Sequence, residues 1–233
     1  MQFSRARDQL FSRQGAGFAW LWAMYMSPSA TADPIRHSVR TFDRADFDAA
    51  CASLMRMVAA SYSPTLLIGI RTGGLVVAES MARAAAGSLP VLPLTCQRAG
   101  TATKSRLPFL HQLLAVLPRG VVDALRLLEH RLLSPRRKRL AKKPNIDHTE
   151  ATAIGAQLAT THSQHRLLVV DDAVDSGVTL ETVVGLLRSS CPADTDIRSA
   201  VITVTLEAPR AEPDYALYRG VLCRFPWSFD AAR

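Results

Sequence analysis

Residues 167–180 read Leu-Leu-Val-Val-Asp-Asp-Ala-Val-Asp-Ser-Gly-Val-Thr-Leu, and this stretch decides the fold. Residues 166–170, apolar after the first, are typical of a buried strand, and the apolar spacing over residues 180–187 predicts a helix. Asp171 and Asp172 stand between the two, at the carboxyl end of the strand. Ligands of parallel α/β sheets bind at this edge.

The turn at residues 175–179 is typical of a phosphate site. Backbone N–H groups of such a turn and of the following helix N-terminus bind a phosphate, and the Ser176 and Thr179 hydroxyls add donors. Gly177 lets the backbone come close to the ligand. Carboxylates repel phosphate, so the preceding acidic pair must face hydroxyls or a hydrated cation such as Mg²⁺. A phosphate beside sugar hydroxyls indicates a ribose 5-phosphate, whereas a plain acidic turn with a helix cap is the alternative.

Helices and strands alternate along most of the chain. The sequence predicts a helix from Phe42 with Asp43 as its N-cap, strands at residues 65–70, 89–94 and 199–206, and helices at residues 75–86 and 150–160. Pro90 and Pro93 indicate that the second of these strands lies at a sheet edge or has a frayed end. This alternation predicts an α/β fold with a parallel sheet flanked by helices.

A second loop, Gly-Ile-Arg-Thr-Gly-Gly-Leu at residues 69–75, follows the first predicted strand. Taken alone, a glycine pair after a strand is commonly just a turn. Together the two loops resemble those of the type I phosphoribosyltransferases, nearest to the xanthine/hypoxanthine-guanine branch. The resemblance runs from about Phe42 to Trp227. It implies the family's parallel sheet with a small hood, 5-phosphoribosyl-1-pyrophosphate as substrate and Mg²⁺ as cofactor.

The resemblance also implies roles for individual residues. The ribose hydroxyls and magnesium would be held by Asp171 and Asp172, the 5-phosphate by Ser176, Gly177, Val178 and Thr179, and the pyrophosphate by Arg71, Thr72 and Gly73. Asp175 matches the catalytic acid that accepts a proton near N7 of the base in the 6-oxopurine branch. Near the end of the chain, Phe225 or Trp227 would stack on the base, although both are also ordinary core residues.

Two departures leave the acceptor open. Thr72 stands where purine salvage enzymes most often have Arg directly before the glycine pair, and pyrimidine-operon regulators of the family carry a related Arg-Thr loop. The lysine that follows the last core strand in the purine enzymes is missing from residues 205–208. A carboxylate such as Glu207 would instead prefer a base edge that offers N–H donors.

Basic residues concentrate in one segment. Residues 98–143 carry 12 Lys or Arg against 2 Asp or Glu, a net charge of +10 that leaves −2 for the rest of the chain. We expect a helical insertion at about residues 96–146, packed on the domain or on a second subunit of a homodimer and not on a membrane. Its basic cluster suits a phosphate-rich partner such as RNA but holds no aromatic for stacking bases.

The first 40 residues are interpreted as an N-terminal extension ahead of a domain at residues 41–233. Basic residues, an apolar stretch at residues 15–26 and small residues at 29–32 also form a secretory pattern. Because the expected substrate is a cytosolic metabolite, we favour the extension and a cytoplasmic protein. The four cysteines form no C-x-x-C pair, which fits a reducing compartment.

The sequence thus predicts a pentosyltransferase of nucleotide salvage. It would transfer the phosphoribosyl group of 5-phosphoribosyl-1-pyrophosphate to a nitrogen acceptor, in particular a purine-like base, and release pyrophosphate. The alternative is a non-catalytic sensor of the same metabolite that regulates RNA or a protein partner. An enzyme with a non-nucleobase acceptor is compatible with the same residues.

Overall fold

The computed structural model describes residues 38–85, 87–97, 144–161 and 164–228. The predicted extension up to residue 37 and the predicted helices of the basic insertion, within residues 98–143, lie outside the described residues. No described helix is long and apolar enough to cross a membrane.

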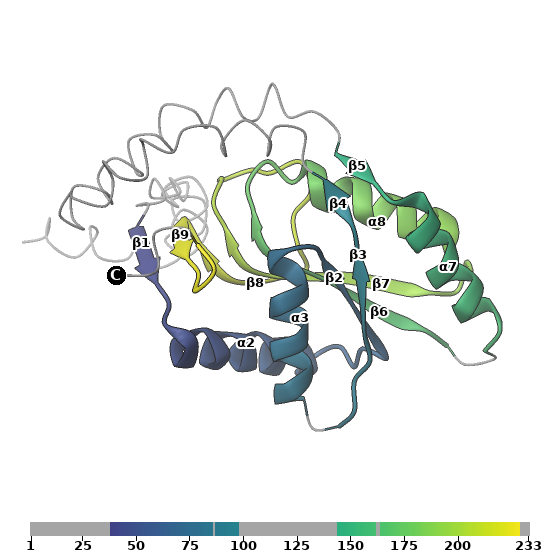
Figure 1. Ribbon diagram of the computed structural model, residues 1–233, viewed down its shortest axis with the longest axis horizontal. Helices are drawn as coiled ribbons and strands as arrows, with labels where there is room; N and C mark the ends of the chain where they lie inside the picture. Colours follow the sequence, from purple (N-terminus) through teal and green to yellow (C-terminus); the bar gives the residue numbers. More distant parts are fainter. Residues whose placement is uncertain (1–37, 86, 98–143, 162–163, 229–233) are drawn as a thin grey trace, which may run out of the picture. The chain divides into compact units, whose positions relative to one another are not determined.

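Five parallel strands form the central sheet in the order β3-β2-β6-β7-β8 (Figure 1). These strands are β2 (Leu66–Ile70), β3 (Val91–Leu94), β6 (Arg166–Val174), β7 (Asp196–Val204) and β8 (Tyr215–Arg219). The prediction of a parallel α/β sheet is confirmed. β3 lies at one edge, as its prolines predict, because proline cannot donate a ladder hydrogen bond to a second neighbour.

Helices cover both faces of the sheet: α2 (Arg44–Ala59) and α3 (Gly73–Ala84) on one, α7 (His148–Ala159) and α8 (Val178–Ser190) on the other (Figure 1). Successive strand residues point to opposite faces. Leu168 and Val170 therefore pack with α2 and α3, whereas Leu167 and Val169 pack with α7 and α8. A strand buried on both sides must be apolar throughout, which explains the uninterrupted run in this part of the sequence.

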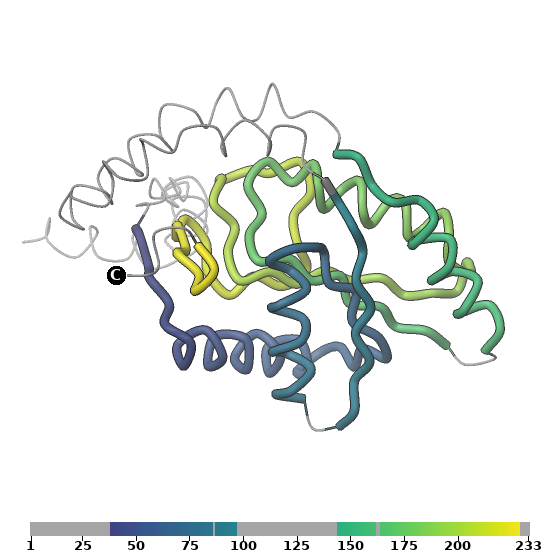
Figure 2. The backbone as a smooth tube through the Cα atoms, viewed as in Figure 1, coloured from purple at the N-terminus to yellow at the C-terminus, as the bar shows by residue number. Residues whose placement is uncertain are grey.

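Two short ribbons complete the described fold. β1 (Ser38–Thr41) pairs in parallel with β9 (Val221–Arg224), so the two ends of the domain, purple and yellow in Figure 2, lie side by side as the small hood. β4 (Cys96–Gln97) pairs antiparallel with β5 (Asn145–Ile146), which closes the base of the predicted insertion. The predicted domain boundary after residue 40 cuts through β1. The domain begins earlier because these residues gain ladder partners from the far end of the chain.

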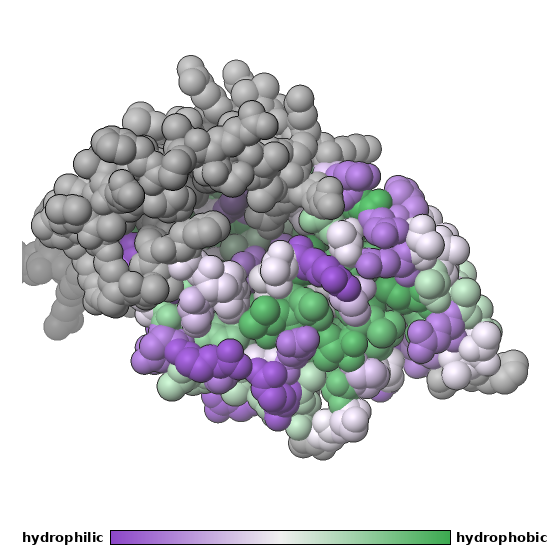
Figure 3. Space-filling model, viewed as in Figure 1, coloured by the Kyte–Doolittle hydropathy of each residue, from purple (hydrophilic) through white to green (hydrophobic). Residues whose placement is uncertain are grey.

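α2 and α3 are held together by Asp48 as well as by apolar contact. Its carboxylate accepts a hydrogen bond from Ser80 Oγ (2.7 Å) and lies 3.0 Å from the Arg44 guanidinium and 3.6 Å from that of Arg83. The Ser80 hydrogen bond, together with the arginines, lowers the pKa of Asp48. Figure 3 shows the hydrophilic surface of α2 beside the apolar side chains around α3 and β3.

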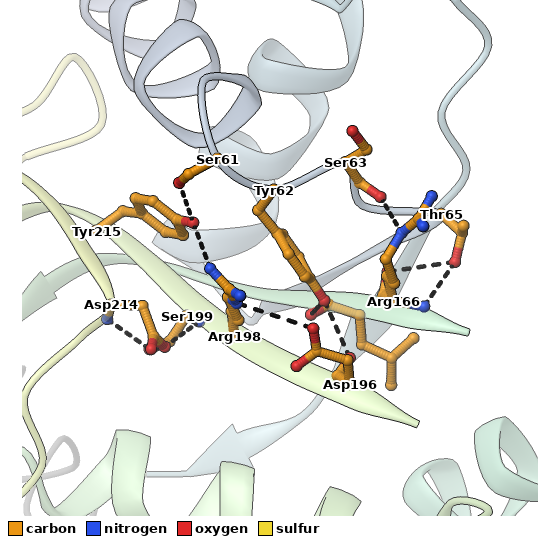
Figure 4. A network of polar contacts seen from close by, with 11 residues as sticks. Ser61, Tyr62, Ser63, Thr65, Arg166, Asp196, Arg198, Ser199, Asp214 and Tyr215 are labelled. Atoms are coloured by element: carbon orange, nitrogen blue, oxygen red, sulfur yellow. Dashed lines mark hydrogen bonds and ion pairs between the residues drawn. The ribbon is translucent and has the colours of Figure 1, made fainter. Parts of the chain in front are cut away.

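The amino edge of the sheet is tied to the end of α2 by a polar network (Figure 4). The buried Tyr62 hydroxyl lies 3.0 Å from the carbonyl oxygens of Leu167 and Asp196, on two neighbouring strands. The Arg198 guanidinium lies 4.6 Å from the centre of the Tyr62 ring and donates to Tyr215 Oη (3.0 Å). These bonds satisfy strand-end groups at the edge opposite to the Asp171-Asp172 pair.

We expect Tyr62→Phe to lower the free energy of unfolding by about 1–2 kcal/mol, because it removes the single hydroxyl proton that the Leu167 and Asp196 carbonyl oxygens share. Tyr218→Phe is the matched control, since its hydroxyl only accepts a hydrogen bond from the exposed Arg40 (2.8 Å). Urea denaturation monitored by circular dichroism measures both. Equal stability losses in the two variants would contradict a special role for the Tyr62 network.

Candidate functional site

The carboxyl end of β6 projects beyond its neighbour β2. β6 pairs with β2 as far as Val170 but with β7 as far as Val174. The strand is therefore four residues longer than the sequence predicts, because the β7 ladder overrides the low strand propensity of aspartate. Asp171 and Asp172 lie in this projecting part, beside the turn that follows β2.

That turn approaches β6 closely through Gly73. A Cβ atom on Gly73 would overlap the carboxylate of Asp172, so glycine lets α3 begin here without displacing that carboxylate. α3 accordingly starts at Gly73, two residues earlier than predicted, despite the low helix propensity of glycine. The peptide bond between Arg71 and Thr72 is cis. The structure thus brings the two loops predicted from the sequence together at one edge of the sheet.

The two carboxylates are oriented by backbone donors. The N–H of Asp172 donates to Asp171 Oδ1 (2.9 Å), and the N–H of Ala173 donates to Asp172 Oδ1 (2.9 Å). Asp171 is only 3% exposed, whereas Asp172 is half-buried. Within the described part of the chain, no group of three or more His, Cys, Asp or Glu residues surrounds a metal position. Two carboxylates nevertheless fit Mg²⁺, which is typically held by one or two carboxylates together with substrate phosphates and water.

The predicted phosphate turn precedes α8. Gly177 is the N-cap of α8 with φ +78°, a left-handed conformation that side chains rarely adopt. The turn packs on the loop after β7, where Arg210 N–H donates to Ser176 O (2.8 Å). A Cβ on Gly177 would lie 2.6 Å from Ala211 N.

Neither α3 nor α8 receives a side-chain cap from its N-cap residue. Thr72 makes no such hydrogen bond, and Gly177 has no side chain to make one. The first N–H groups of a helix have no partner within the helix and carry a partial positive charge. The two helices therefore place two N-termini of positive partial charge after β2 and β6, adjacent strands of the sheet, with the acidic pair at the end of β6.

Asp175 lies in the turn after β6 and is half-buried. Its Oδ1 accepts a hydrogen bond from Thr205 Oγ1, at 2.5 Å. Thr205 follows β7, and nothing in the local sequence pairs it with residue 175. This partner was missed because the contact depends on the pairing of β6 with β7.

The two predicted stacking aromatics differ in exposure. Phe225 is 4% exposed and stacks on Phe42, with ring centroids 5.8 Å apart, so a base-stacking role for Phe225 is incompatible with its burial. Trp227 stacks on Phe225 at 5.0 Å and meets the edge of Phe47 at 5.1 Å, but 38% of it is exposed. Of the two, only Trp227 keeps surface for a ligand.

The hood strand β9 brings Cys223 within electrostatic range of Asp172. Burial raises the pKa of the Cys223 thiol to about 11, and the negative charge of Asp172 adds to this shift. The Cys51 thiol in the core also has its pKa raised to about 11, mainly by burial. Both thiols are protonated at neutral pH and are therefore poor nucleophiles.

Comparison with known proteins shows the family and the fold of the chain. The family model of the phosphoribosyl transferase domain matches residues 43–232. No curated protein matches the sequence significantly. Among solved structures, the purine phosphoribosyltransferase of Pyrococcus horikoshii Ot3 is 19% identical, with 82% of this chain and 95% of that chain covered and a TM-score of 0.50.

Two further solved structures share the fold. The xanthine-guanine-hypoxanthine phosphoribosyltransferase of Helicobacter pylori is 16% identical, with 82% and 95% of the two chains covered and a TM-score of 0.50. A hypothetical protein of Neisseria gonorrhoeae with bound ppGpp is 15% identical, with 82% and 89% covered and a TM-score of 0.52. The family match over most of the chain, and a fold shared with purine enzymes, show that this chain belongs to the phosphoribosyl transferase domain family.

Proposed function

We propose that this phosphoribosyltransferase transfers the phosphoribosyl group of 5-phosphoribosyl-1-pyrophosphate to a nitrogen of a purine-like base and releases pyrophosphate. The observation that carries the proposal is the contact of Gly73 with the Asp172 carboxylate. This contact brings the N-terminus of α3, proposed to bind an anion, beside the acidic pair. The N-terminus of α8, proposed to bind a second anion, lies at the same edge of the sheet. One ligand with a phosphate, a pyrophosphate and ribose hydroxyls between them matches this order of groups.

Each part of the substrate has a partner of suitable chemistry. The 5-phosphate is assigned to the turn from Ser176 to Thr179 at the start of α8, and the pyrophosphate to Arg71, Thr72 and Gly73 at the start of α3. The ribose hydroxyls donate hydrogen bonds to Asp171 and Asp172. The same two carboxylates would hold Mg²⁺, which neutralises charge on the pyrophosphate when bound.

Catalysis would consist mainly of positioning and charge stabilisation. As the bond from C1 of the ribose to pyrophosphate breaks, positive charge develops on the sugar and negative charge on the leaving group. The N-terminus of α3 and Arg71 stabilise the leaving group. Asp175 accepts the proton that the base loses near N7 as the lone pair of another ring nitrogen attacks C1.

A purine-like acceptor is supported by Asp175, which stands where the 6-oxopurine branch has its proton acceptor, and by the exposed surface of Trp227. Relatives of the same fold include a purine enzyme and a xanthine-guanine-hypoxanthine enzyme. Glu207, exposed after β7, suits a base edge with N–H donors. We therefore place guanine, xanthine, hypoxanthine and adenine first in an acceptor screen, with the reaction assigned to nucleotide salvage.

A non-catalytic sensor of 5-phosphoribosyl-1-pyrophosphate is the second candidate. It is favoured by Thr72 in place of Arg and by the missing lysine among residues 205–208. A related fold with bound ppGpp also makes regulation by a nucleotide worth testing. Pyrophosphate release with any acceptor base excludes the sensor.

In a calorimetric titration with 5-phosphoribosyl-1-pyrophosphate and Mg²⁺, we expect the wild type to bind and Asp171→Asn/Asp172→Asn to lose binding. The charged pair is the only part of the proposed site that holds both the ribose and the metal. Asp194→Asn/Asp196→Asn is the control, since it removes the same charge at the opposite edge of the sheet. Wild-type protein that fails to bind would refute the ligand.

Gly177→Ala should weaken binding of ribose 5-phosphate while leaving binding of pyrophosphate unchanged. The added methyl group is strained at φ +78° and crowds the backbone of Arg210 and Ala211, which distorts the turn before α8 and costs about 1–3 kcal/mol. Gly185→Ala in the middle of α8 is the matched control, because a Cβ there meets no atom within 4 Å. Separate titrations with the two anions measure the effect, and a parallel loss of both would count against two distinct anion sites.

Asp175→Asn should keep the affinity for 5-phosphoribosyl-1-pyrophosphate but lower turnover by about 10²-fold or more, because the amide cannot accept the proton. Coupled pyrophosphate-release kinetics with the best base of the screen measure this. Asp194→Asn serves as the control for loss of a single carboxylate. Turnover of Asp175→Asn equal to that of the wild type would exclude the proton-acceptor role.

A further inference from the structure

We propose that Thr205 is a positioning residue, which fixes the Asp175 carboxylate for the transfer step. The inference rests on the phosphoribosyl transfer proposed above and adds a residue to it. Thr205 is the first residue after β7 and is 4% exposed, with its hydroxyl 2.5 Å from Asp175 Oδ1. Its partner is the acid to which the proposed mechanism assigns the proton.

The Thr205 hydroxyl donates its hydrogen bond to the carboxylate of Asp175. Thr205 Oγ1 also lies 3.4 Å from the carbonyl oxygen of Val174, but a hydroxyl has a single proton to donate. A charged acceptor at the shorter distance forms the stronger hydrogen bond. Thr205 therefore donates its hydrogen bond to Asp175, and its longer contact with the Val174 carbonyl oxygen is secondary.

The direction of this hydroxyl is set by the backbone. Thr205 N–H donates to Val174 O at 2.9 Å, and Val174 is paired with Val204 in the sheet. The β-branched side chain of threonine has few rotamers. The donor is thus held by the sheet itself, next to the residue that precedes Asp175.

Unlike Thr205, Asp175 is not held by hydrogen bonds of the sheet ladder. It follows the last residue of β6 and lies in a bend, outside the ladder. With Oδ1 held by Thr205, the proton-accepting role falls to Oδ2, and the plane of the carboxylate is defined before the base binds. A misplaced catalytic group costs rate even when binding is intact, because reacting atoms must be aligned.

Thr203 provides a matched control on the same strand. It is 0% exposed, and its Oγ1 donates to Val221 O in the hood at 2.6 Å. Thr203→Val and Thr205→Val each remove one buried hydroxyl and keep the shape of the side chain. Only Thr205→Val removes a partner of Asp175.

The experiment measures pyrophosphate-release kinetics, affinity for 5-phosphoribosyl-1-pyrophosphate and melting temperature for Thr205→Val, Thr205→Ser, Thr203→Val and Asp175→Asn/Thr205→Val. We expect Thr205→Val to lower kcat about tenfold to a hundredfold, with the substrate Kd within about twofold of wild type. Thr205→Ser, which keeps the hydroxyl, restores turnover. In the Asp175→Asn background, Thr205→Val causes no further loss of kcat, since residues that act as a unit are not additive.

Other results overturn the inference. The first is a loss of kcat in Thr205→Val that is equally large with and without the Asp175→Asn change. The second is a similar loss of kcat in Thr203→Val. The third is a Thr205→Val variant that loses substrate affinity and melting temperature together. Wild-type turnover retained in Thr205→Val overturns this inference alone and leaves the transfer reaction standing. Wild-type protein that releases no pyrophosphate with any base overturns the proposed function, and this inference with it.

Discussion

The close approach of α3 to the end of β6 is the constraint on which the site depends. Gly73 lies against the Asp172 carboxylate because it has no side chain, and a methyl group there would have to displace that carboxylate. This contact requires β6 to project past β2, which the longer ladder with β7 makes possible. Strand length and the glycines at the start of α3 together place a helix N-terminus beside an acidic pair.

The carboxyl edge of the sheet carries groups of positive charge and groups of negative charge, which suit different parts of a ligand. Helix N-termini and Arg71 attract phosphate groups, whereas Asp171 and Asp172 attract hydroxyls and a cation. Neither set alone would select a phosphorylated sugar: the first accepts any anion, and the second any hydrated cation. Their spacing on neighbouring strands is the basis of the proposal that one ligand carries both kinds of group.

The polar groups at the amino edge of the sheet stabilise the fold. There the polar groups of Tyr62, Arg198 and Tyr215 bond to strand ends and to one another, which anchors the strands that carry the site. At the carboxyl edge, Thr205 and the backbone of Arg210 bond to Asp175 and Ser176. The sheet and the loop after β7 thus support the turn after β6, and supports of this kind can hold a reacting group in place without touching the substrate.

The sequence by itself determined the α/β class, the edge position of β3, the two loops and their family, since apolar periodicity, proline and glycine act locally. It underestimated β6 by four residues and started α3 two residues late, because ladder partners and close packing override local propensity. It did not predict β1 and β9 or the bond from Thr205 to Asp175, which join residues far apart in the chain. Only the tertiary structure decided that Phe225 is core while Trp227 keeps exposed surface, because burial depends on which side chains meet in space.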